Sequence, residues 1–135
     1  MSSKRKSAPP DSIALFLNEW QAQRPDLDPW PLGILGRVAR ISLYLQRHAQ
    51  RWLAPLGLTW ETFSMIAALR RAGPPFEQKP SDLLRLTRGR ALADQAIALH
   101  FEEAAKLLGF LSKSDRALLD GLLSQMLLRL ENGEE

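Results

Sequence analysis

Apolar residues recur at intervals of three and four along most of the chain, and this period constrains the fold more than any other feature of the sequence. The clearest run lies between about residues 32 and 53, where one seam contains Ile34, Val38, Ile41, Leu45, His48 and Trp52. Such steps place side chains on one face of a helix that packs against other helices. No segment alternates apolar and polar residues well enough to indicate a strand. The sequence therefore predicts an all-α fold.

Prolines, glycines and capping residues divide this pattern into separate helices. Three prolines between residues 24 and 31 must break a first helix, because proline does not fit a helix interior. We expect a first helix capped by Asp11 or Ser12, a second over residues 32–53 that is closed by Pro55 and Gly57, and a third capped by Thr59. A short fourth helix should cover residues 82–86, and a fifth should cover residues 90–111. The last helix should be capped by Ser112 and closed by Asn132-Gly133.

The composition is that of an ordinary globular protein. The chain has 135 residues, 45% of them hydrophobic and 24% charged, and these values argue against disorder throughout. The absence of cysteine excludes disulfides and thiolate metal sites. No apolar run approaches the roughly 20 residues of a membrane span, and none follows the basic start as an export signal would require. We expect a disordered basic tail over residues 1–10, a single helical domain over 11–135, no membrane partner and a cytoplasmic location.

The positive charge is local rather than general. The formal net charge is +3, and Lys4, Arg5 and Lys6 in the tail supply all of it. Between Asp28 and Glu61 there is no acidic residue, whereas four arginines fall there, at positions 37, 40, 47 and 51. A dense basic band can meet phosphate. It can equally pair with acidic helices such as the one that carries Glu102 and Glu103. The sequence leaves both interpretations open.

The sequence carries no recognisable catalytic arrangement. Glu102 and Glu103 are adjacent, so on a helix they point about 100° apart and make a poor acid–base couple. The two histidines lack the spacing of a metal site, and no phosphate-binding glycine loop is present. We expect no enzyme activity, no metal and no cofactor.

The first and last predicted helices carry broad apolar faces that a chain of this length cannot cover with a second layer. The simplest cover is a second copy of the chain, although a compact monomeric bundle is the alternative. The residues that we assign to a homodimer interface are Ile13, Phe16, Leu17, Leu119, Leu122, Leu123, Met126 and Leu130.

Several short motifs follow one another in a characteristic order after the tail. They are Trp20-Gln-Ala-Gln-Arg-Pro-Asp-Leu-Asp28, Arg37-Val-Ala-Arg-Ile41, Leu53-Ala-Pro-Leu-Gly-Leu-Thr59, Lys79-Pro-Ser-Asp-Leu-Leu84, Arg88-Gly-Arg-Ala-Leu92 and Leu111-Ser-Lys-Ser-Asp-Arg116. In this order they resemble the MarR family of bacterial transcription regulators, and within it the PecS and urate-responsive branch. The resemblance covers nearly everything after the tail.

The resemblance implies a homodimer of winged-helix subunits that binds palindromic, double-stranded promoter DNA under the control of a small ligand. Residues 11–57 would form N-terminal dimerisation and ligand-binding helices. Residues 58–87 would belong to the helix-turn-helix lobe, and residues 88–135 would form the C-terminal dimerisation helices.

The chain departs from the family pattern between Leu86 and Arg90. Where the family has a recognition helix and a two-stranded wing, Leu86-Thr87-Arg88-Gly89-Arg90 joins the flanking helices directly. We therefore predict a MarR-type dimer body that lacks the recognition helix and the β-wing. Either this segment is deleted, or the sequence omits residues between Thr87 and Arg88. A true deletion predicts a continuous helix or a tight turn through residues 85–90.

The residues that remain for DNA contact are Lys79, Ser81, Arg85, Arg88 and Arg90. Such side chains meet phosphates, which position a protein on DNA without reading its sequence. A helix-turn-helix reads bases with its second helix, for which this chain offers no candidate. We therefore expect DNA binding to be weak, salt-sensitive and non-specific. The alternative interpretation of these residues is a solvated basic surface.

The resemblance also implies a ligand site that includes Trp20 and Ser64. Trp20 corresponds to a tryptophan that borders a small-ligand pocket, although it can equally be a packing residue. Ser64 stands where the urate-responsive branch has an aspartate, and serine carries no negative charge. An aromatic or phenolic effector other than urate therefore fits better.

Three functions follow from the sequence. The first is a dimeric, ligand-modulated transcription regulator. The second is a dimerisation module without DNA binding, which would form inactive heterodimers with a full-length relative. The third is a protein that binds a small aromatic ligand through the pocket alone.

Urate itself is the first ligand to test. We predict weak or no binding, because Ser64 offers no carboxylate and the recognition helix that supplies an arginine is missing. Isothermal titration calorimetry with urate should give no saturable heat. A tight, saturable isotherm would contradict the prediction.

Overall fold

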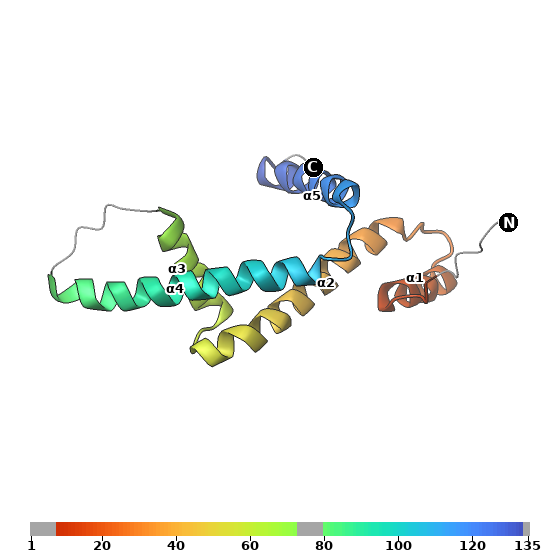
Figure 1. Cartoon of the computed structure of the whole chain (residues 1–135). Helices are drawn as coiled ribbons and strands as arrows, with labels where there is room; N and C mark the ends of the chain where they lie inside the picture. Colours follow the sequence, from red (N-terminus) through yellow and green to blue (C-terminus); the bar gives the residue numbers. More distant parts are fainter. Residues whose placement is uncertain (1–7, 73–79, 134–135) are drawn as a thin grey trace. The chain divides into compact units, whose positions relative to one another are not determined.

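A computed structural model describes residues 8–72 and 80–133 of the chain, and its description of side chains leaves out residue 72 and residues 80–88. The described residues form α1 (Ser12–Gln23), α2 (Trp30–Leu53), the short 3₁₀ helix η1 (Ala54–Leu56), α3 (Trp60–Ala72), α4 (Pro80–Leu107) and α5 (Lys113–Glu131), and they contain no strand (Figure 1). The predicted all-α fold is confirmed for this part of the chain.

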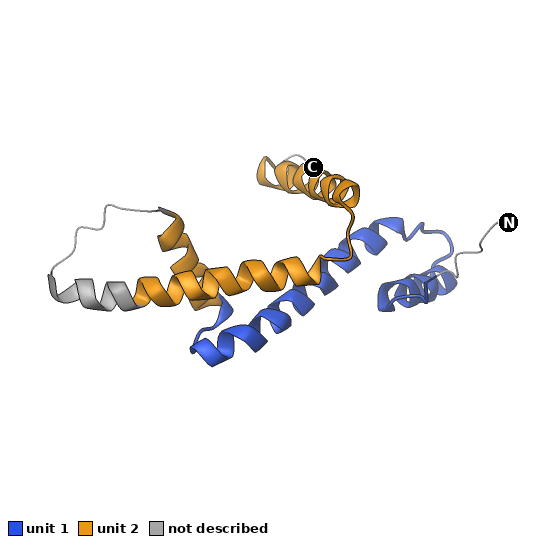
Figure 2. Ribbon diagram, viewed as in Figure 1, with its two compact units in different colours: residues 1–60 blue, residues 61–135 orange. Residues whose placement is uncertain are grey.

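The helices belong to two compact units, residues 1–60 and residues 61–135 (Figure 2). The first unit contains α1, α2 and η1, and the second contains α4, α5 and nearly all of α3. The predicted tail begins outside the described residues, and residues 8–10 are exposed and belong to no helix.

The helix ends follow local capping chemistry. The carboxylate of Asp11 accepts a hydrogen bond of 2.8 Å from the amide of Ala14, and the hydroxyl of Ser112 accepts one of 3.1 Å from Asp115. Gly57 after η1 and Gly133 after α5 have φ angles of 71° and 65°, a left-handed conformation that favours glycine. The predicted caps and the predicted endings at these positions are confirmed.

In the first unit α1 packs closely on the beginning of α2, and two glycines permit the approach. A Cβ atom at Gly33 would lie 3.2 Å from a methyl group of Leu17, and one at Gly36 would lie 3.3 Å from a methyl group of Ile13. Ile13 is accordingly buried. A side chain at either position would require the neighbouring leucine or isoleucine methyl group to shift by a few tenths of an ångström.

An ion pair spans the same helix crossing. The Nε of Arg37 donates to Asp11 at 2.9 Å, its Nη2 donates to the other carboxylate oxygen at 3.3 Å, and its Nη1 donates to the carbonyl of Gly33 at 3.3 Å. Asp11 therefore caps α1 and binds α2 with the same carboxylate. The hydrogen bond from Arg37 is the main reason why the pKa of Asp11 lies below its usual value.

The second unit has a small core between α3 and α4. Phe63 on α3 and Ala93 and Ala96 on α4 are buried. The Nε of Arg70 donates to Asp94 at 2.8 Å and ties the same two helices together at their surface. The ring of Phe63 also meets His100 edge-on, with the ring centroids 5.3 Å apart.

Three predicted helix boundaries were wrong. The helices expected over 82–86 and 90–111 are one helix, α4, which runs from Pro80 to Leu107. Gly89 is the one residue inside it that disfavours a helix, and an interior glycine costs only about 1 kcal/mol. α4 also ends four residues earlier than expected. α2 begins at Trp30 rather than at residue 32, because Pro31 is accepted in a first turn.

Among the described residues, none of the helices combines the length and the apolar character that a membrane crossing requires.

We predict that the substitution Asp11→Asn lowers the melting temperature near neutral pH, because it keeps a capping oxygen but removes the charge that Arg37 binds. Since the pKa of Asp11 is lowered in the folded chain, its stabilisation is complete above the unfolded value of about 3.9 and is lost as the pH falls through the folded value. The effect will be small, because both side chains are largely solvated. Thermal unfolding followed by circular dichroism between pH 2 and 7 measures it. If the melting temperatures of the wild type and the variant differed as much at pH 2 as at pH 7, the lost ion pair would not be the cause of the difference.

Candidate functional site

Trp20 stands near the end of α1 and lines two depressions in the first unit. Its side chain is 44% exposed, and its ring meets Phe16 edge-on at a centroid distance of 6.2 Å. One depression, of about 240 Å³, is bounded by Phe16, Glu19, Trp20 and Gln23. The other is larger and lies between α1 and the start of α2. The predicted ligand residue therefore faces open space rather than a packed core.

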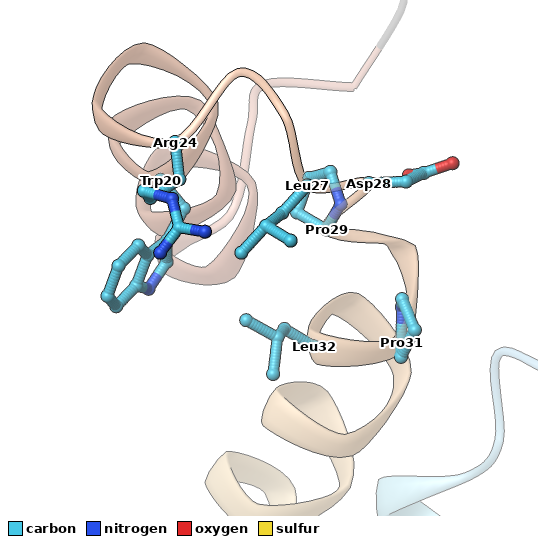
Figure 3. Close-up of a pocket in the computed structure, with 7 residues that line it drawn as sticks. All are labelled: Trp20, Arg24, Leu27, Asp28, Pro29, Pro31 and Leu32. Carbon is cyan, nitrogen blue, oxygen red and sulfur yellow. The ribbon is translucent and has the colours of Figure 1, made fainter.

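The larger depression has a volume of about 340 Å³, which falls within the range of small-ligand pockets (Figure 3). The connection between α1 and α2 folds back beside Trp20, with the amide of Leu27 bonded to the carbonyl of Arg24 at 3.1 Å. This turn brings Leu27 toward Leu32 of α2 (Figure 3). The lining residues are Trp20, Arg24, Leu27, Asp28, Pro29, Pro31 and Leu32.

The two charged groups at this pocket already have partners. Arg24 binds Asp26 through two hydrogen bonds, of 2.9 and 2.7 Å, and this contact raises the pKa of Arg24 and lowers that of Asp26. Asp28 accepts a hydrogen bond of 3.3 Å from the amide of Trp30. The rest of the lining is an indole ring, two leucines and two prolines. Such a pocket suits a flat, largely apolar ring better than an anion.

Ser64, the second predicted ligand residue, lies on α3 and is exposed. It belongs to the second unit, whereas Trp20 and the pocket belong to the first. The structure therefore builds the pocket from the first unit alone. The other residues of the pocket were not predicted from the sequence. The signal that could have indicated them is Leu27, an apolar residue that lies between prolines in the α1–α2 connection.

Of the five residues predicted to contact DNA, the structure describes one side chain. Arg90 is exposed on α4. Ser81, Arg85 and Arg88 belong to the same helix, but their side chains lie outside the described residues, and Lys79 lies outside them altogether.

The residues predicted for a dimer interface divide into two groups. On α1, Ile13 is buried within its own chain, Leu17 is partly covered and Phe16 is exposed. On α5 no residue is buried, Met126 is half-buried, and Leu122 and Leu123 are 56% and 43% exposed. Leu119 and Leu130 on the same face are exposed as well. The uncovered surface therefore lies mainly on α5.

α2 carries a second uncovered apolar surface that the interface assignment missed. The first four residues of its seam, Ile34, Val38, Ile41 and Leu45, are all exposed. The three-and-four spacing had already indicated this apolar face, but it could not indicate that these four side chains are exposed.

Within residues 8–72 and 80–133, no three or more histidine, aspartate or glutamate side chains gather to hold a metal ion.

No family model matches the chain. Over 72 residues it is 32% identical to the HTH-type transcriptional regulator PecS of Dickeya dadantii (strain 3937). The matched segment is 53% of this chain and 43% of that relative, so the chain spans less than half of the regulator's length. This partial similarity supports the resemblance to the MarR family that the sequence motifs carry, and it favours a regulator over an enzyme.

Proposed function

We propose that the chain is a MarR-type transcription regulator that acts as a homodimer on double-stranded promoter DNA and responds to a small aromatic or phenolic effector. The observation that carries the proposal is the 32% identity to an HTH-type transcriptional regulator over 72 residues. The apolar helix faces and the pocket beside Trp20 are the structural features that fit it.

The dimer is proposed because α5 and the α2 seam are apolar and uncovered. Monomeric proteins rarely expose contiguous apolar patches of more than a few hundred Å². Burial of such surface gains about 25 cal/mol per Å², and closed two-fold pairing is the commonest way to obtain it. Leucines on α5 recur at positions 119, 122, 123 and 130, so one face of that helix would enter the interface.

The effector is proposed from the chemistry of the larger pocket. Trp20 and Leu32 offer apolar surface from two different helices, and Arg24 is neutralised by Asp26. A neutral aromatic or phenolic compound can therefore stack on the indole without the loss of an ion pair. The absence of an unpaired cation also agrees with the weak urate binding expected from the sequence.

The continuity of α4 favours one alternative function. Pro80 and Leu107 belong to a single helix, and this continuity supports a chain without a separate recognition helix in that stretch. A chain of this kind would serve as a dimerisation module that pairs with an intact regulator and blocks it.

DNA selection separates the two functions. Random duplexes are enriched on the dimeric protein, and the enriched sequence is compared with a scrambled duplex by fluorescence anisotropy at fixed salt. A regulator should prefer the enriched sequence by at least about 10³-fold, the lower end for specific DNA-binding proteins. Equal affinity for both duplexes, with an intact dimer, would contradict the regulator and support the module.

We predict that Leu123→Glu converts the dimer into a monomer, because the interface would bury an unpaired carboxylate. The neighbouring change Ser124→Glu adds the same charge to an exposed polar position and should leave the dimer intact. Sedimentation velocity measures the outcome against the 15.2 kDa mass of one chain. A wild-type protein that sediments as a monomer at high concentration would contradict the proposed homodimer.

A further inference from the structure

One face of α2 carries a line of exposed basic side chains. Arg40, Arg47 and Arg51 (the arginine row) are separated by seven and four residues, so they lie on the same side of the helix within about 40°. All three are exposed, and Tyr44 lies among them with its ring 5.9 Å from the guanidinium carbon of Arg47. Between Trp30 and Leu53 the helix contains no acidic residue.

Four cations of the described residues have a carboxylate partner, whereas the arginine row has none, as is also true of Arg71, Arg90, Lys113, Arg116 and Arg129. Arg24, Arg37, Arg70 and Lys106 each form an ion pair, with distances between 2.7 and 3.3 Å. Within the described part of the chain, none of the three row arginines forms one. Their positive charge is therefore available to an external anion.

The two glutamates of α4 that the sequence suggests as partners of this band have a cation on their own helix. The ammonium of Lys106 lies 3.2 Å from Glu102 and 3.3 Å from Glu103, on the same helix. Part of the negative charge of these two glutamates is therefore neutralised within α4 itself.

The arginine row begins at the point along α2 where α1 no longer covers that helix. Gly33 and Gly36, which contact α1, lie on the same side of α2 as the arginines, because Gly33 precedes Arg40 by two turns and Gly36 precedes it by one. Arg37, beside them, is held by Asp11. α1 therefore protects the first part of this side and leaves the rest open to a partner.

The spacing of the charges suits a long polyanion better than a small one. At 1.5 Å per residue, Arg40 and Arg51 are about 16 Å apart along the helix axis, too far to grip one phosphate group together. A DNA strand presents a phosphate every 3.4 Å of duplex axis, so the same length spans about five base pairs. Guanidinium groups are well suited to phosphate recognition.

A membrane surface fits less well than DNA. A helix that lies in a bilayer interface carries basic residues on a broad polar face opposite its apolar face. Here the arginines flank only one side of the seam, and the other flank carries Ala39, Ser42 and Gln46. The seam itself is assigned to the homodimer, and its centre lies about 120° around the helix from the row.

We propose that the arginine row of α2 binds the phosphate backbone of double-stranded DNA, outside the helix-turn-helix segment. The choice of DNA as the polyanion rests on the proposed function. Because phosphates carry no sequence information, this contact would raise affinity equally for every sequence.

The test is the salt dependence of binding to a random-sequence duplex, measured by anisotropy between 50 and 200 mM salt. We expect Arg40→Gln, Arg47→Gln and Arg51→Gln together to lower the slope of log K against log salt by up to about 2.7 per protomer, since each lost contact contributes about 0.9. At the lowest salt, affinity should fall by tenfold or more. The matching lysine triple should retain most of the slope.

A second triple controls for the loss of three charges. Lys113→Gln, Arg116→Gln and Arg129→Gln remove as much charge from α5 and should leave the slope unchanged. Circular dichroism and sedimentation velocity confirm that every variant keeps the helical fold and the association state of the wild type.

The outcomes separate this proposal from the proposed function. If the α2 triple binds like the wild type, or if both triples lose affinity equally, the arginine row is not a DNA contact. If the α2 triple alone loses affinity while the wild type shows no sequence preference, the row is confirmed and the regulator function fails. Wild-type binding to vesicles of anionic lipid but not to DNA would overturn the proposal in favour of a membrane surface.

Discussion

In the described part of the chain α2 and α5 expose apolar faces, and the rest of the structure depends on this constraint. α5 contains no buried residue, although leucine is its commonest side chain. The α2 seam is exposed over its first half. Helices gain most of their stability from packing of an apolar face, so these two faces would leave their helices marginal in water. Association that covers them would therefore stabilise the fold itself, and stability would rise with protein concentration.

In the described part of the chain, some charged side chains form ion pairs that join two helices, whereas others form no ion pair. Asp11 with Arg37 fixes the crossing of α1 and α2, and Arg70 with Asp94 fixes α3 on α4. These pairs are exposed, so each contributes little to stability but specifies geometry. The arginine row contributes to neither purpose. Three solvated cations on one side of a helix repel one another modestly, and nothing in the fold of the first unit requires them there.

Sequence reasoning succeeded where the signal is local. The caps at Asp11 and Ser112 and the endings at Gly57 and Gly133 depend on residues within a turn of each other, and all four were predicted. The all-α class followed from the apolar period in the same way. The separate helices expected over 82–86 and 90–111 were wrong, whereas the continuous helix that a true deletion predicts through residues 85–90 is present in α4.

The features that sequence reasoning missed depend on contacts between helices. Arg70 and Asp94 are 24 residues apart, and a helical period says nothing about which partner a face will meet. For the same reason the seam of α2 was recognised as apolar without being recognised as uncovered. Trp20 was singled out through the family resemblance, but its pocket depends on how the turn at Leu27 folds back, which the prolines permit without specifying.

The first unit places the pocket, the ion pair and the start of the arginine row along one helix crossing. A ligand between Trp20 and Leu32 would contact both α1 and α2, so its binding energy would act on their relative position. Asp11 and Arg37 join the same helices, and the glycines at 33 and 36 set their spacing. A ligand changes such an equilibrium only if it binds one arrangement better than another. An effector that altered the crossing would also alter how much of α2 is covered by α1. The amount of arginine row and apolar seam open to partners would change with it, and such a change would couple a small pocket to both proposed surfaces through a single helix.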